Sequence, residues 1–96
     1  MLKSDHKVPG GKMVRVRMEV KGEKIERIQI CGDFFLYPEE ALPKLEELLR
    51  GVKTEEEDIL NRIKEAYRRL GIVSLGVDPR EFAVAIMKAL KERDRL

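Results

Sequence analysis

The spacing of apolar residues changes once along this chain, close to Pro38. Before it, valines and a methionine alternate with charged residues over residues 14–20, and Ile28 and Ile30 share one face within residues 25–31. A period of two with β-branched side chains is typical of strands that bury one face. The short turn at 21–24 joins these strands as an antiparallel hairpin. After Pro38, leucines and isoleucines follow helical spacing.

Three helices are expected in this second part. The first should begin at about Pro43, since proline suits the first helical position, and end at residue 50. A capping box at 54–57 should open the second, which runs to residue 70. Asp78 and the proline after it should open the third, which ends in the charged run 91–95. Residues 72–77 form either a buried connector or a brief strand.

Strands followed by helices predict an α+β fold. We expect a small antiparallel sheet, made of the hairpin plus a short third strand within residues 32–36, with three helices packed on one face. Residues 1–11 are predicted to be an N-terminal arm, because Pro9 and two glycines interrupt regular structure and residues 3–7 offer no core side chain. Residues 12–96 should form a single domain.

The composition excludes several classes of function. Lysine and arginine nearly balance the acids, giving a net charge of +2, so a nucleic-acid partner is not expected. No apolar run is long enough to span a membrane, and the N-terminus lacks an apolar signal core, so we expect a cytoplasmic protein without a membrane partner. The high charge content with few amide side chains indicates a thermophilic source.

Few residues in this chain could carry chemistry. Gly10-Gly11-Lys12 lacks the strand-before, helix-after context of a phosphate loop, so it is expected to be a flexible hinge or a close backbone approach to a partner. His6 has no other metal-ligating side chain nearby and is interpreted as a solvated arm residue. Cys31 is interpreted as a small buried hydrophobe, with a reactive thiol as the less favoured alternative. No nucleophile, base and orienting group come together.

The stretch Gly32-Asp33-Phe34-Phe35 holds two of the three phenylalanines. Adjacent residues of an extended chain point to opposite sides, so one phenylalanine should enter the core and the other should face outward. Gly32 is expected to relax the backbone at the strand exit and Asp33 to cap a turn. The outward ring is either a partner anchor or an isolated exposed apolar residue.

Four stretches stand out together: GGKMV at 10–14, the run ending in GDFF at 28–35, the segment from PEEAL at 38–51, and the segment from PREF at 79–90. Taken together they resemble the C-terminal accessory domain of lipoate–protein ligases. The resemblance spans about residues 7–90, and GDFF is its most specific part. That family's fold is similar in turn to sulfur-transfer scaffold proteins.

The resemblance implies a function in protein lipoylation. Such ligases activate lipoate with ATP to lipoyl-AMP and then transfer the lipoyl group to a lysine of a lipoyl-acceptor domain. The catalytic domain's Arg-Arg, glycine-rich lipoate loop is absent here, since Arg68-Arg69 precedes Leu70 and Gly71. The chain therefore resembles a separate accessory subunit, forming a heterodimer with the catalytic subunit. It would be required for the adenylation step and dispensable for transfer from preformed adenylate.

On this resemblance, ATP, lipoate and Mg²⁺ are used by the complex, and none is bound by this chain alone. Docking is expected to favour a competent conformation of the catalytic subunit. The residues predicted to contact or activate the partner are Lys7, Gly10, Gly11, Lys12, Gly32, Asp33, Phe34 and Phe35. Three alternatives stay open: a sulfur-transfer scaffold using Cys31, a small nucleic-acid-binding adaptor, and a self-associating structural domain.

Overall fold

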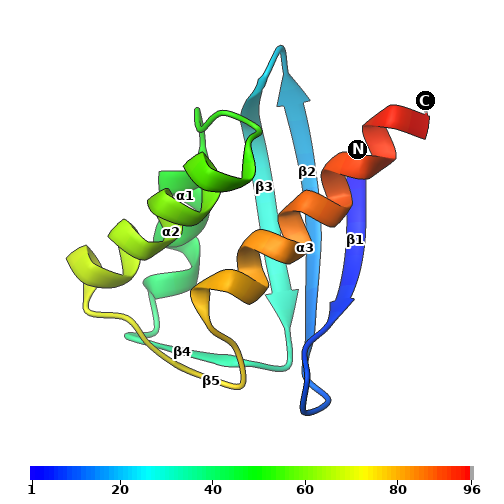
Figure 1. Ribbon diagram of the computed structural model, residues 1–96. Helices are drawn as coiled ribbons and strands as arrows, with labels where there is room; N and C mark the ends of the chain where they lie inside the picture. Colours follow the sequence, from blue (N-terminus) through cyan, green and yellow to red (C-terminus); the bar gives the residue numbers. More distant parts are fainter. Residues whose placement is uncertain (96) are drawn as a thin grey trace.

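Three helices cover one face of a three-stranded antiparallel sheet in the computed structural model, which describes residues 1–95 (Figure 1). The elements in chain order are β1 (Leu2–Lys7), β2 (Met13–Lys21), β3 (Lys24–Gly32), β4 (Phe35–Tyr37), α1 (Ala41–Leu49), α2 (Glu56–Leu70), β5 (Val73–Leu75), α3 (Pro79–Lys91) and the short 3₁₀ helix η1 (Glu92–Arg95). This arrangement confirms the predicted α+β class. None of the helices in residues 1–95 is long and apolar enough to cross a membrane.

The central strand of the sheet is β2, which pairs with β1 on one side and β3 on the other. Its alternate residues Val14, Val16 and Met18 are fully or almost fully buried against the helices, as the period-two pattern predicts. The β2–β3 hairpin is also confirmed, with a register shift between Glu19 and Val20. The inner side chains of the sheet and the apolar stripes of the three helices make up one core.

The prediction of an arm over residues 1–11 is wrong, because most of this segment forms the edge strand β1 and the hairpin turn that follows it. β1 pairs antiparallel with β2 from Leu2 to Lys7. Pro9 and the two glycines end this strand and do not prevent it. The strand was overlooked because Ser4 and His6 occupy inward positions where apolar residues are normally expected.

Two of the three helices begin elsewhere than predicted. α1 starts at Ala41, so Pro43 lies in its first turn, where a backbone N–H has no partner within the helix. The prediction of a capping box at 54–57 is also wrong. The Thr54 backbone N–H and hydroxyl both donate to the Glu23 carbonyl, and Glu55 precedes α2 without a side-chain cap. α3 begins as predicted, with Asp78 accepting from two backbone N–H groups.

The short strand expected within residues 32–36 is not part of the main sheet. β4 pairs with β5 as a separate two-stranded antiparallel ribbon, and the third strand of the main sheet is β1. For residues 72–77, the alternative of a brief strand is therefore the one that forms. Figure 1 shows this ribbon beneath the helices, at the end of the sheet where the β1–β2 turn also lies.

Candidate interaction surface at one end of the sheet

Two segments predicted to contact a partner meet at the same end of the sheet. Lys7, the last residue of β1, is paired with Met13, and the end of β3 is paired with β2 through Gly32 and Val14. The turn 8–12 and the stretch 32–35 therefore leave the sheet side by side (Figure 1). Residues from two distant parts of the sequence are brought together, while their role in binding stays a prediction.

The turn 8–12 is held by two backbone hydrogen bonds of its own. The Val8 N–H donates to the Lys12 carbonyl at 2.7 Å, and the Gly11 N–H donates to the Val8 carbonyl at 3.0 Å. Gly10 and Gly11 adopt positive φ angles of 102° and 99°, which residues with a Cβ rarely adopt. The glycines thus shape a tight hairpin turn.

Gly32 is needed for close packing, which corrects the expectation that it relaxes the backbone. A Cβ at this position would lie 2.0 Å from the Met13 carbonyl oxygen and within 3 Å of the Phe34 ring. Asp33, expected to cap a local turn, instead accepts the Met13 N–H through Oδ1 at 2.8 Å. This hydrogen bond lowers the pKa of Asp33, and the charge of Lys12 acts in the same direction.

The two adjacent phenylalanines point to opposite sides, as predicted. Phe34 is buried, and its ring packs edge-to-face on Phe82 of α3, with centroids 5.2 Å apart and planes at 85°. Phe35 is 59% exposed. One ring therefore fixes the start of the ribbon to the core, and the other is presented to solvent.

The outward face of the β4–β5 ribbon is apolar. Phe35 lies directly opposite Leu75, and Tyr37 lies opposite Val73, so all four side chains project from one face. Each is more than half exposed. Among residues 1–95, Met1 is the one other large hydrophobic residue that is more than half exposed, and Val84 follows at 38%. We call these four residues the ribbon face.

The sequence interpretation found only Phe35 among the four residues of the ribbon face. The signal was present, because FLY and VSL each have two apolar residues on one side of the strand, with Leu36 or Ser74 between them on the other side. Each run is three residues long, however, and the two lie more than thirty residues apart. Their pairing, which puts the four side chains on one face, appears only in three dimensions.

Lys12 connects the turn to the ribbon. Gly76, immediately after β5, has φ +86°, and a Cβ there would lie 2.9 Å from Lys12 Cγ. The alkyl part of Lys12 thus packs over this glycine, and both line a shallow hollow with Val8 and Asp78. Lys12 accordingly lies next to the ribbon face and offers a positive charge at its border.

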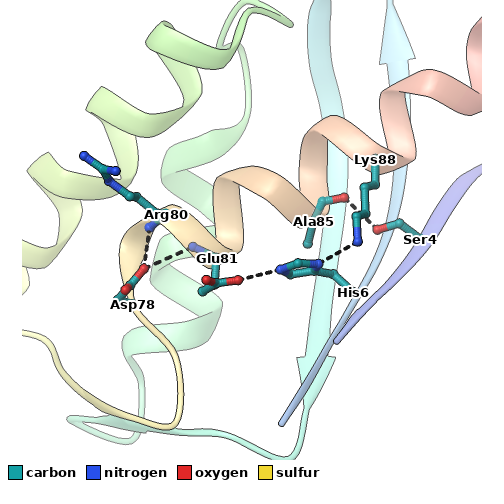
Figure 2. Close-up of polar contacts among 7 residues, drawn as sticks. All are labelled: Ser4, His6, Asp78, Arg80, Glu81, Ala85 and Lys88. Carbon is teal, nitrogen blue, oxygen red and sulfur yellow. Dashed lines mark hydrogen bonds and ion pairs between the residues drawn. The ribbon is translucent and has the colours of Figure 1, made fainter. Parts of the chain in front are cut away.

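The interpretation of His6 as a solvated arm residue is also wrong, because its side chain is buried and joins β1 to α3 (Figure 2). Its Nδ1 lies 2.8 Å from Lys88 Nζ, and its Nε2 lies 2.5 Å from Glu81 Oε2. An ammonium group can only donate, so Nδ1 accepts from Lys88 and Nε2–H donates to Glu81. On the same strand, the Ser4 hydroxyl donates to the Ala85 carbonyl at 2.6 Å. These contacts satisfy the two polar residues that made β1 look like an arm.

Cys31 is also placed differently from the expectation of a buried hydrophobe. It is exposed on the face of the sheet that the helices leave open, because Ile28 and Ile30 take the inward positions of β3. Within residues 1–95, no three His, Cys, Asp or Glu side chains gather as a metal site. The features that the structure does assemble are the apolar ribbon face and the positive charge of Lys12 at its border.

Comparisons with known proteins found matches to one family. A family model described as the bacterial lipoate protein ligase C-terminus matches residues 1–86. A relative named lipoate-protein ligase A subunit 2, from Thermoplasma acidophilum, is 35% identical over 74 residues, which cover 77% of this chain and 76% of the relative. A solved structure of a bi-partite lipoate protein ligase and its E2 lipoyl domain, from the same organism, matches with a TM-score of 0.78 and 33% identity. That match covers 90% of this chain and 94% of the other.

Proposed function

This chain belongs to the family of lipoate protein ligase C-termini, and from that premise we propose that it is the accessory subunit of a two-chain lipoate–protein ligase. It forms a cytoplasmic heterodimer with a catalytic subunit and has no ligase activity alone. The complex activates lipoate with ATP to lipoyl-AMP and then lipoylates acceptor domains. The accessory subunit is required for the activation step.

The observation that carries this proposal is the ribbon face. Exposure of four large apolar side chains on one side of a ribbon to water is unfavourable relative to their burial. Such patches mark protein–protein contacts. Aromatic residues such as Phe35 and Tyr37 are also frequent anchors of interfaces. A chain with an apolar face of this kind is well suited to be one subunit of a lasting complex.

We assign the nucleotide and metal chemistry to the catalytic subunit. The glycine turn at 10–11 leads into a strand, so no helix N-terminus faces an anion there, and residues 1–95 hold no cluster suited to a metal ion. These residues do not fit a nucleotide–metal site of their own. Lys7 and Lys12 lie at the end of the sheet that carries the ribbon face, and from there they could approach a phosphate bound by the partner.

The activation is proposed to be conformational. A partner shifts a conformational equilibrium only through its different affinity for the two states. The ribbon face would therefore bind more tightly to the catalytic-subunit conformation that can hold ATP and lipoate together. Gly32 and Asp33 contribute indirectly, because they fix the path of the chain into the ribbon.

Reconstitution tests the proposed function. The catalytic subunit from the same genome is mixed with this chain, ATP, Mg²⁺ and lipoate, and pyrophosphate release is followed, with each chain alone as a control. We expect release only from the mixture and co-elution of the two chains on a sizing column. Full release from the catalytic subunit alone would refute an activating role. Unchanged release after Lys7→Ala and Lys12→Ala would exclude these lysines from it.

A further inference from the structure

The face of the main sheet opposite the helices is open and rich in cations. Alternate residues of all three strands project from it, and none of these residues is aromatic. The cations on this face are Lys3, Lys7, Arg15, Arg17 and Arg27, all exposed, and the acids are Asp5 and Glu19, with Glu92 of η1 bordering its edge. We call this surface the open face.

Two of the five cations of the open face lie opposite an acid, Arg15 opposite Asp5 and Arg27 opposite Glu19, while Lys3, Lys7 and Arg17 face no acid across the sheet. Lys3 lies directly opposite Arg17, and the next strand places Gln29 on the other side of Arg17. Like charges directly opposite one another in a sheet are destabilising. Among residues 1–95, the one ion pair within this face joins Arg15 to Asp5, at 3.2 Å. The fold thus tolerates repulsion between Lys3 and Arg17 on an exposed surface.

The charge is also segregated along the chain. Residues 1–32, which supply the sheet, hold eight Lys and Arg against four Asp and Glu, a net +4. Residues 33–96, which supply the ribbon and the helices, hold twelve against fourteen, a net −2. The near-neutral total of the protein therefore conceals a positive side, whose field would attract and orient an acidic partner.

We propose that the open face is a docking surface for an acidic protein surface, and that its occupant is the lipoyl-acceptor domain. This inference rests on the proposed function, in which two different proteins must contact the ligase. A lasting subunit contact requires apolar burial, which the ribbon face provides. An acceptor must arrive and leave in every catalytic cycle, and exposed charges favour fast, reversible association. The absence of aromatic side chains among the open-face residues disfavours single-stranded nucleic acid, which binds by stacking.

Docking on this chain would raise the local concentration of the acceptor near the catalytic subunit. Its effect should therefore appear at limiting acceptor concentration. Transfer at saturating acceptor would remain a property of the catalytic subunit. The expected signature is a change in the KM for the acceptor at constant kcat.

The test uses the reconstituted complex and the acceptor domain from the same organism. The double variant Arg17→Glu and Arg27→Gln reverses one exposed charge and removes a second. Glu at position 17 lies opposite Lys3, and Gln at position 27 lies opposite Glu19, so neither change puts like charges opposite one another. The matched control, Lys64→Glu and Arg68→Gln, makes the same change in net charge on exposed positions of α2. Pyrophosphate release before addition of acceptor is measured for each protein.

We expect the open-face variant to raise the KM for the acceptor about 10-fold at low salt, with kcat and pyrophosphate release unchanged. The wild-type KM should rise with salt toward that of the variant. A KM equal to that of the α2 control would overturn the docking proposal. Salt-dependent binding of an RNA homopolymer, lost in the variant while the acceptor KM is unchanged, would also overturn it. Absence of pyrophosphate release from the wild-type complex would instead refute the proposed function.

Discussion

The ribbon face and the open face are both outward faces of antiparallel strands, yet they present opposite chemistry. The ribbon directs Phe35, Tyr37, Val73 and Leu75 into solvent, while the main sheet directs lysines and arginines outward. Alternation alone assigns a residue to the inner or outer side of a strand. The chemical type of the outward residues then indicates what the surface can bind. Apolar residues indicate a lasting contact, and charged residues indicate a reversible one.

The largest expected effect tests whether the ribbon depends on the core. Phe34 and Phe35 are adjacent, but only Phe34 packs on Phe82. Phe34→Ala should lower the free energy of unfolding by about 3 to 4 kcal/mol, because it leaves a cavity between the ribbon and α3. Phe35→Ala should change it by less than about 0.5 kcal/mol. Urea denaturation of both variants measures the difference, and similar values would contradict the opposite placement of the two rings.

The next effect separates the ribbon face from an ordinary exposed hydrophobe. Phe35→Ala should weaken binding of the catalytic subunit by about 2 kcal/mol, roughly 30-fold in Kd, because an aromatic anchor is lost from the interface. Val84→Ala is the matched control, since Val84 is an exposed apolar residue on α3. Titration calorimetry measures both affinities. Equal affinities for the two variants would remove the ribbon face as the site of docking.

A third prediction concerns the attachment of β1, which carries part of the open face. His6→Ala removes the contacts to Glu81 and Lys88 and should lower the free energy of unfolding by about 1 to 2 kcal/mol. Amide hydrogen exchange should become faster in β1, while affinity for the catalytic subunit stays close to that of the wild type. Lys3→Ala, an exposed change on the same strand, is the control. Unchanged exchange in β1 after His6→Ala would show that the strand does not need this contact.

These contacts explain which parts of the fold could be predicted from sequence. The β2–β3 hairpin and the start of α3 depend on residues close together in the chain, such as the Asp78 cap, and they were predicted correctly. β1 was not, because Ser4 and His6 are inward polar residues whose partners lie more than seventy positions away on α3. Sequence periodicity counts apolar side chains and does not detect a polar residue that is buried and satisfied.

The candidate surface shows the same limit. The opposite directions of the two rings in GDFF were predicted correctly, because the alternation of adjacent side chains in an extended chain is a local rule. Tyr37, Val73 and Leu75 were missed, since their grouping requires the pairing of β4 with β5. The open face was missed for a related reason: the net charge of +2 sums over sides of the molecule that the fold separates.

The smallest expected effect concerns Asp33, which lies between the two surfaces and joins the end of β3 to the start of β2. The hydrogen bond from the Met13 N–H lowers the pKa of Asp33 below its usual 3.8. A lowered pKa in the folded state means that the ionised carboxylate stabilises the fold above the ordinary value, and that this stability is lost as the pH falls through the lowered pKa. Asp33→Asn keeps an oxygen acceptor but does not ionise. We therefore expect the variant to be slightly less stable than the wild type at neutral pH, and the difference to shrink as the pH falls below the ordinary pKa of an aspartate and through the lowered one. Thermal denaturation across this pH range measures the difference. A difference independent of pH would mean that the charge of Asp33 does not contribute to the path of the chain into the ribbon.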